Sequence, residues 1–330
     1  MPPRREVSTQ IVAAFMPDDP IARAIVRMVL YFDVFQHPLT RAELVRLVAP
    51  DAPDAVEAAI HRLAAHGVLE TREVWCYRPG RAASVPRRAA RARHAERTWP
   101  LARLAAALLA RVPFVRGVLI TGGMSKGSTA PGDDVDFMLL VAPGRVWTLK
   151  SLLQGARRAW PEAVRDLFCT NYLLAEDRPL VDDRNLFTAV ELATAVPMYG
   201  PESCTALLRA NDWCLQFVPG MSWAEQRALA AAPLPAAPLA RGLEARVAGA
   251  SGLRLERASV AAWDRYWNRK YAWLDPATRS QRFKRREEVA TNHLHDFQGY
   301  VLDEVRRRMV AVGIDETLEL ARGGQPLREP

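Results

Sequence analysis

The stretch Val118–Val141, VLITGGMSKGSTAPGDDVDFMLLV, decides the expected fold of this chain. It opens with three apolar residues, two of them β-branched, which is typical of a buried strand. Gly122 and Gly123 then end the strand, and glycines let the backbone take a positive φ and approach an anion closely. Asp134 and Asp136 open a second apolar strand, where alternation puts both carboxylates on one face. The stretch therefore predicts two strands, a glycine turn and a pair of neighbouring carboxylates.

The carboxylate pair and the polar residues before it predict a site for a nucleoside triphosphate (NTP) and metal ions. Two carboxylates on one face repel each other unless a cation lies between them. Mg²⁺ binds one or two protein carboxylates together with substrate phosphates. Two such ions could steady the attacking and leaving oxygens of a phosphoryl transfer. We therefore expect Asp134 and Asp136 to bind two Mg²⁺ ions. Backbone amides, hydroxyls and one ammonium group can donate to phosphate oxygens, which gives this set of phosphate-binding residues: Gly122, Gly123, Ser125, Lys126 and Ser128.

At these residues the chain resembles the DNA polymerase β-like nucleotidyltransferase superfamily, in which a Gly-Gly or Gly-Ser turn is followed about ten residues later by Asp-x-Asp or Asp-x-Glu. Gly122 and Gly123 match the turn, and Asp134 and Asp136 match the carboxylate motif. The pair at 127–128, Gly-Ser, also matches the branch that holds poly(A) polymerases and oligoadenylate synthetase-like enzymes. The resemblance covers roughly residues 113–200. It implies that the turn holds the triphosphate and that the two aspartates bind the metal ions of a nucleotidyl transfer.

The superfamily usually carries a third carboxylate on a later strand, and this chain departs from that pattern. The next strand-like segment, residues 167–174, offers Asn171 as its inward polar residue, and an amide cannot act as a base. Asp166 lies at the start of this segment, and Glu191 lies on an expected helix further on. Either the third carboxylate is Asp166 or Glu191, or the site is weakened and the protein is a slow or non-catalytic version.

Length and composition indicate a globular protein of two or three domains, with 330 residues and 49% apolar content. The start of the chain lacks the apolar core of a signal peptide, and no run of about 18 apolar residues predicts a membrane span. The four cysteines are scattered without a Cys-x-x-Cys pair, which favours small core residues in a reduced, cytoplasmic setting over disulfides or zinc. They are Cys76, Cys169, Cys204 and Cys214.

Basic residues outnumber acidic ones, and the net charge of +8 favours anionic partners such as a nucleotide or a nucleic acid. The basic residues cluster at 81–97, 284–286 and 306–308. Each cluster is either a solvated helix face or a surface that attracts RNA or a triphosphate.

Residues 1–80 are expected to form three helices and a two-stranded hairpin. Thr40 and Glu43 have the spacing of a capping box at the start of the second helix. The phrases HPLTRAELVRLV and IHRLAAHGVLE resemble a winged helix-turn-helix domain. The third helix begins with acids, among them Asp54 and Glu57, which disfavour a DNA backbone. A protein-interaction or structural role is therefore favoured over DNA binding for this domain.

We predict an α+β fold in which a nucleotidyltransferase-type mixed sheet with flanking helices follows the winged-helix-like domain. After this domain, which covers 1–80, we expect a basic helical connector at 81–112 and the catalytic core at 113–218. An Ala/Pro-rich connection at 219–241 and a C-terminal domain at 242–330, helical throughout, complete the chain.

The expected activity is Mg²⁺-dependent transfer of a nucleoside monophosphate from an NTP to an acceptor hydroxyl, with release of pyrophosphate. The acceptor stays open between a small molecule, an RNA end and a protein side chain. The alternative is an NTP sensor or regulator that keeps a degenerate transferase fold and uses its N-terminal domain to bind DNA or a protein.

Overall fold

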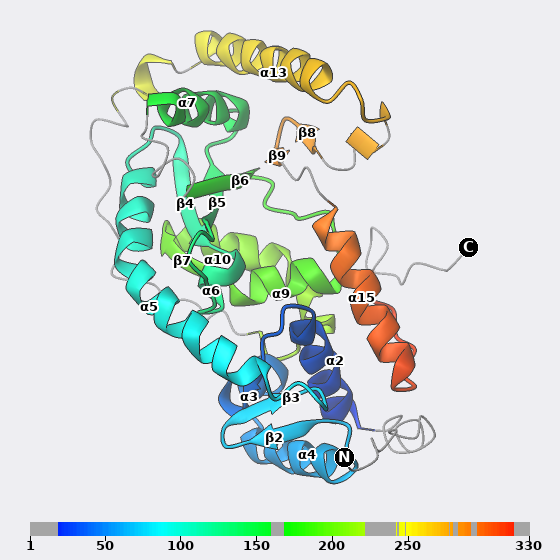
Figure 1. The fold of residues 1–330 in the computed structure, drawn as a ribbon. Coiled ribbons are helices and arrows are strands. Elements are labelled where there is room, and N and C mark those ends of the chain that lie inside the picture. The colour runs from blue at the N-terminus through cyan, green and yellow to red at the C-terminus, as the bar shows by residue number, and fades with distance from the viewer. Residues whose placement is uncertain are drawn as a thin grey trace.

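The structure, a computed structural model, describes residues 19–159, 168–221, 242, 244–247, 249–276, 278–279, 283–291 and 296–319. Within these residues the chain is a mixed α+β protein, which confirms the predicted class (Figure 1). Its strands form a three-stranded sheet in the order β1-β3-β2 and a six-stranded sheet in the order β7-β4-β5-β6-β9-β8. No helix in these ranges combines the length and the apolar character that a membrane crossing needs.

The N-terminal elements are three helices and a small antiparallel sheet: α2 (Pro20–Val34), β1 (Leu39–Thr40), α3 (Arg41–Val48), α4 (Pro53–Ala65), β2 (Glu70–Arg72) and β3 (Trp75–Tyr77). Asp19 caps α2 by accepting a hydrogen bond from the backbone N–H of Ala22 at 2.9 Å. The predicted capping box of α3 is confirmed, since the side chains of Thr40 and Glu43 each accept from the other's backbone N–H. Gly67 follows α4 with a φ of +70°, a conformation that favours glycine. Local sequence therefore sets the ends of these helices.

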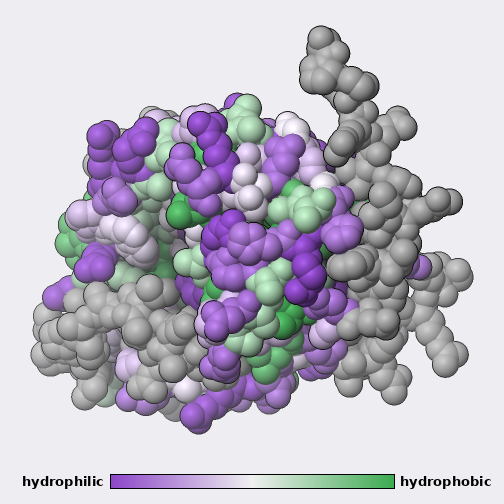
Figure 2. All heavy atoms as spheres, turned by 90° about the horizontal axis from the view of Figure 1, so that it is seen from below, coloured by the Kyte–Doolittle hydropathy of each residue, from purple (hydrophilic) through white to green (hydrophobic). Residues whose placement is uncertain are grey.

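The face of the molecule on the side of α4 and β2 is seen in Figure 2, where hydrophilic side chains are interleaved with small hydrophobic areas. The first turn of α4 exposes Asp54, and Glu57 pairs with Arg41 of α3. The start of α4 therefore keeps the acidic character expected from the sequence.

The larger sheet is built from β4 (Val115–Ile120), β5 (Val135–Val141), β6 (Phe168–Ala175), β7 (Val196–Tyr199), β8 (Arg285–Arg286) and β9 (Val289–Thr291). The helices around it are α5 (Ser84–Leu109), α6 (Gly122–Ser125), α7 (Val146–Ala159), α9 (Leu186–Thr194), α10 (Pro201–Ala210), the short η1 (Asp212–Gln216), α13 (Ala250–Lys270) and α15 (Phe297–Ala311). The pair β5–β6 is parallel and the other pairs are antiparallel. A parallel pair needs a crossover connection, and α7 lies in it.

The two faces of this sheet pack against different helices, because alternate residues of a strand point to opposite faces. In β5, Phe137 and Leu139 join the core formed with α5, α7 and α13. Met138 and Leu140 join a second core formed with α9, α15 and the N-terminal helices. Asp136 alternates in step with Met138 and Leu140. Its carboxylate therefore belongs to the face that α9 and the N-terminal helices cover.

The N-terminal helices are joined to the sheet by this second core. Phe32 of α2 belongs to the same buried cluster as Leu192 of α9, Trp213 of η1 and Val305 of α15. In Figure 1 the N-terminal helices α2, α3 and α4 lie below the sheet, while α7 and α13 lie above it. The N-terminal elements are thus part of the packing that surrounds Asp136.

The prediction that the chain is helical throughout after residue 242 is wrong for residues 285–291. Strands β8 and β9 form a hairpin here, and β9 pairs with β6 in the larger sheet. The two strands are short and one of them is charged, so only the neighbouring strand β6, far away in sequence, makes this segment extended. Strand β7 was not predicted either. It has four residues, one of them Pro197, and it pairs with β4, which is far away in sequence. The expected connection at 219–241 lies, from residue 222 on, outside the described residues.

Candidate functional site

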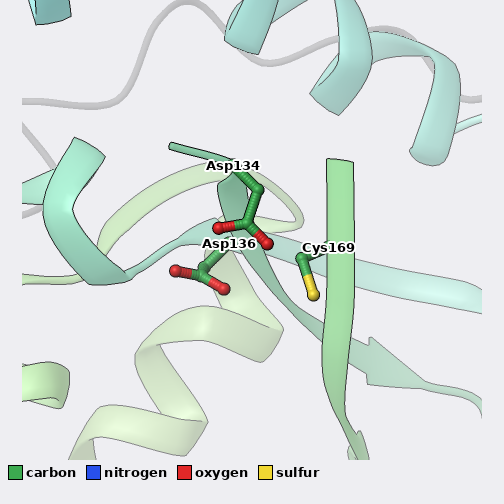
Figure 3. Close-up of side chains that lie close together, drawn as sticks. All are labelled: Asp134, Asp136 and Cys169. Atoms are coloured by element: carbon green, nitrogen blue, oxygen red, sulfur yellow. The ribbon is translucent and has the colours of Figure 1, made fainter. Parts of the chain in front are cut away.

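Asp134 and Asp136 lie together at the start of β5, beside Cys169 of β6 (Figure 3). Each offers one atom, a carboxylate oxygen or the thiol sulfur, and these three atoms lie within 4.8 Å of one another. Asp134 is exposed, whereas Asp136 and Cys169 are half-buried. In the part of the chain that the structure describes, this is the group of acidic, cysteine and histidine side chains close enough to hold a metal ion.

An irregularity in β6 places Cys169 in this cluster. The register pairs Asp136 with Cys169 and Met138 with Tyr172, so β6 has one more residue than β5 in this interval. Such a β-bulge interrupts the alternation of a strand and re-aims its side chains. Asn171 lies in the bulge, and its Nδ2 donates to Oδ1 of Asp136 at 3.1 Å. The strand therefore presents a thiol and an amide to the carboxylate pair.

The glycine turn closes directly onto the second carboxylate. Gly122 has a φ of +65°, and a Cβ added to it would collide with Oδ2 of Asp136. A Cβ on Gly123 would lie 2.6 Å from the backbone oxygen of Ser128. Real Cβ atoms do not approach so closely, so both positions need glycine. The predicted turn and the predicted carboxylates are therefore in contact.

Glu191 and Lys126 hold the turn in place. Oε2 of Glu191 accepts from the backbone N–H of Gly122 at 3.0 Å, and its Oε1 accepts from Nζ of Lys126 at 2.8 Å. Nζ of Lys126 also donates to the backbone oxygen of Gly122 at 3.0 Å. The two side chains are mostly buried, with exposed fractions of 12% for Lys126 and 22% for Glu191. Glu191 is thus a partner of the turn, and it is not part of the carboxylate–thiol cluster.

Burial and neighbouring charges make Asp136 hard to ionise in the absence of a cation. Its pKa is raised to about 7, first by burial and then by the negative charges of Asp134 and Glu191, while Lys126 opposes the shift. Burial and the two aspartates also raise the pKa of Cys169 to about 12. Near neutral pH the thiol of Cys169 is therefore neutral, and the carboxyl group of Asp136 ionises less readily than an ordinary one.

Arg88 of α5 ties the N-terminal elements to the loop after the turn. This arginine is 6% exposed. Its guanidinium donates to the backbone oxygens of Gly127 at 2.7 Å and Lys126 at 3.2 Å. It also donates to Oε1 of Glu43 at 3.2 Å and to Nε2 of His37 at 3.1 Å. One buried side chain therefore connects α3, the segment after α2 and the expected phosphate-binding loop.

His37 accepts that hydrogen bond as a neutral ring. Burial lowers its pKa well below the ordinary value, and the positive charges of Arg88, Lys126 and Arg91 lower it further. A neutral imidazole keeps an acceptor nitrogen for the guanidinium, so the link between the N-terminal elements and the loop does not depend on His37 carrying a charge.

A cavity of about 550 Å³ opens beside the turn and reaches from the carboxylates to the N-terminal helices. Its lining includes Gly122, Gly123, Lys126, Ser128, Asp136, Asn171 and Glu191. It also includes other residues of α2, α5, α9 and the start of α15. Its volume is within the range of small-molecule sites.

Some of the predicted site residues line the cavity and others do not. Gly122, Gly123, Lys126, Ser128 and Asp136 line the cavity. Asp134 is not among the lining residues, but it lies in the cluster with Asp136 and Cys169. Ser125 is not among the lining residues, and its hydroxyl donates to the backbone oxygen of Gly122 at 3.0 Å. Asp166 lies outside the described residues.

Cys169 was predicted as a small core residue, and this prediction is wrong. Cys76, Cys204 and Cys214 are buried free thiols, but Cys169 is only half-buried and lies in the cluster. The sequence did mark Asn171 as the inward residue of the strand. Alternation puts Cys169 on the same face as Asn171. Only the bulge pairs Cys169 with Asp136, and a bulge cannot be read from alternation alone.

The donors of the cluster can hold a divalent cation. Asp134 and Asp136 supply hard carboxylate oxygens, which suit Mg²⁺ or Mn²⁺. The thiol of Cys169 is a soft ligand only as a thiolate, and its raised pKa keeps it protonated. Carboxylate oxygen is therefore the ligand that this site offers near neutral pH.

No protein-family model, no curated protein and no solved structure matches this chain. What the site can do follows from its own residues.

Proposed function

We propose that this protein is a metal-dependent nucleotidyltransferase, which moves a nucleoside monophosphate from an NTP to an acceptor hydroxyl and releases pyrophosphate. The observation that carries the proposal is the contact of the Gly122 turn with the carboxylate of Asp136 at the wall of one cavity. Backbone amides freed of side chains and a pair of carboxylates are the two things that a metal-bound triphosphate needs. The N–H of Gly122 already donates to Glu191, so this contact supplies a backbone without side chains close to the carboxylate of Asp136.

Asp134 and Asp136 would hold the Mg²⁺ ions, which withdraw charge from the phosphate oxygens when bound. Gly122, Gly123 and Ser128 line the cavity beside them and would face the β- and γ-phosphates. Lys126 adds a positive charge close to these phosphates, although its ammonium is already paired with Glu191. Its role would be to hold the turn and to lower the cost of bringing an anion there.

The acceptor hydroxyl must lose a proton, and the described residues offer no third carboxylate at the cluster. Asn171 cannot take up a proton, and the neutral thiol of Cys169 is a poor base. We therefore expect slow turnover compared with an enzyme that has a dedicated general base, which typically contributes about 10²–10⁴-fold.

A second candidate function is an NTP sensor without turnover. The amide and thiol where a third carboxylate is expected favour it, together with the bridge through Arg88. In this case NTP binding to the loop would change the position of the N-terminal elements rather than lead to chemistry.

The test is transfer of label from each α-³²P-labelled NTP in the presence of Mg²⁺, with a bacterial lysate as the source of acceptor. The wild-type protein is compared with an Asp134→Asn/Asp136→Asn variant and with Asp177→Asn, a matched change of an exposed carboxylate. Transfer by the wild type and Asp177→Asn alone supports the transferase. NTP binding without transfer in any sample supports the sensor, and absence of NTP binding by the wild type contradicts both functions.

A further inference from the structure

Part of the cavity lining is aromatic, and three separate parts of the chain contribute to it. Phe32 lies in α2 and Phe35 is the residue that ends this helix. Phe187 lies in α9, and Phe297 is the first residue of α15. The ring centroid of Phe297 lies 5.9 Å from that of Phe35 and 6.1 Å from that of Phe187. The rings of Phe35, Phe187 and Phe297 are therefore one surface, which we call the aromatic wall.

The aromatic wall lies close to the glycine turn. Phe187 and Glu191 are four residues apart on α9, so they lie on the same side of the helix and about 6 Å apart along its axis. Glu191 accepts the hydrogen bond from the backbone N–H of Gly122. A ligand of ordinary size that touches the turn can therefore reach the rings.

The rings of the aromatic wall are not completely buried in the hydrophobic core. Phe32 is buried, but Phe35 and Phe187 are half-buried and Phe297 is 52% exposed. An aromatic ring that keeps accessible area beside a cavity can gain by packing against another ring, as stacked or edge-to-face pairs do.

Two charged groups of the cavity lining, Lys284 and Asp296, already have partners. Nζ of Lys284 pairs with Asp183 and lies 6.0 Å from the ring centroid of Tyr172. Oδ1 of Asp296 accepts from the backbone N–H of Gly299 at 2.9 Å. The aromatic wall therefore suits an uncharged planar group, whereas the glycine turn and Asp136 suit phosphate and metal.

We propose that the aromatic wall binds the planar ring of a small-molecule substrate whose reactive group lies at Asp136. The ring is either the base of the NTP or a ring of the acceptor, and in both cases the N-terminal helix α2 is part of the substrate site. This inference rests on the proposed function for the reaction, but the ring-binding surface can be tested without turnover.

The test measures binding of three probes to the full chain in the presence of Mg²⁺. ATP has a ring and phosphates, tripolyphosphate has phosphates alone, and phenol has a ring alone. The variants are Phe35→Ala and Phe297→Ala, with Phe297→Trp to restore a ring. Trp273→Ala is the matched control, because Trp273 is an exposed aromatic residue (68%) that does not line the cavity. Thermal unfolding of each variant checks that it is folded.

A base on the aromatic wall predicts that Phe297→Ala and Phe35→Ala weaken ATP binding roughly tenfold, while tripolyphosphate binding stays within about twofold. A ring of the acceptor predicts that ATP binding is unchanged and that ligand-observed NMR shows loss of phenol binding in the same two variants. In both cases Phe297→Trp and Trp273→Ala behave like the wild type.

The proposal is overturned if neither ATP nor phenol binding depends on Phe35 or Phe297. Tripolyphosphate separates this failure from failure of the proposed function. If tripolyphosphate still binds, the phosphate site stands and only the ring site is wrong. If tripolyphosphate does not bind to the wild type, the phosphate site assigned to the glycine turn is wrong, whatever the rings do.

Discussion

At residue 122 the backbone accepts only glycine. The backbone of Gly122 is left-handed, and the carboxylate of Asp136 occupies the place of a Cβ. An anion that approaches the turn therefore meets the carboxylate pair as well, which makes a cation necessary at this point.

Gly122→Ala is expected to remove Mg²⁺-dependent NTP binding and to lower the free energy of unfolding by more than about 1 kcal/mol, because Ala at a positive φ is strained and its methyl group displaces Asp136. Gly132→Ala is the control, since Gly132 has a φ of +92° in the same loop with nothing within 4 Å of its added Cβ. Isothermal titration and urea unfolding measure the two effects. Equal losses in both variants would show that backbone strain alone is responsible.

Asp136 predicts how metal binding depends on pH. Its pKa in the folded, metal-free protein is about 7, so below this pH a cation must displace a proton. The apparent affinity for Mn²⁺ or Mg²⁺ should rise by up to about tenfold per pH unit below pH 7 and level off above it. Isothermal titration between pH 5.5 and 8.5 measures this, and a flat profile would contradict the assignment.

The raised pKa of Asp136 has the opposite effect on stability: without metal, the free energy of unfolding should fall as the pH rises. The folded pKa is higher than the ordinary value of 3.8, so the contribution of Asp136 to the free energy of unfolding is fully present below about pH 4 and is lost as the pH rises through 7. Asp136→Asn removes both pH dependences, and added metal should restore stability at high pH only in the wild type.

At the scale of elements, the sequence predicted what local patterns determine. The capping box of α3, the glycine that ends α4 and the strands β4 and β5 follow from neighbouring residues. The bulge in β6 and the hairpin β8–β9 depend on pairing with strands that are distant in sequence. For the same reason the carboxylate pair of the site was predictable, whereas Cys169 and the aromatic wall were not.

Helix α5 is the element that couples the N-terminal part of the chain to the site, through Arg88. Arg88→Lys keeps the charge but cannot reach two backbone oxygens and two side chains together. We expect it to weaken NTP binding about five- to tenfold and to lower the free energy of unfolding by about 1–3 kcal/mol. Arg93→Lys is the control, because Arg93 is an exposed arginine of the same helix. Unchanged NTP affinity in Arg88→Lys would show that the bridge is structural only.

At the scale of the whole molecule, the N-terminal helices share a continuous core with α9, η1 and α15. This predicts that α2 and the sheet unfold together, because partly separated folding units need separate cores. Hydrogen exchange in urea, followed by mass spectrometry, should give the same transition midpoint for peptides of α2 and β5. A lower midpoint for α2 would contradict this prediction, and it would favour an N-terminal unit that moves independently in the way a sensor requires.

The order of the cavity walls along the chain has a consequence for synthesis on the ribosome. Asp136 is made early, whereas Phe297 and Gln298 come from the start of α15. At about 5–20 residues per second, the nascent chain carries the glycine turn and both carboxylates for roughly 10–30 s before the last wall exists. A messenger RNA truncated between the codons of Asp136 and Phe297 would yield a polypeptide that keeps the motif and lacks the enclosed site.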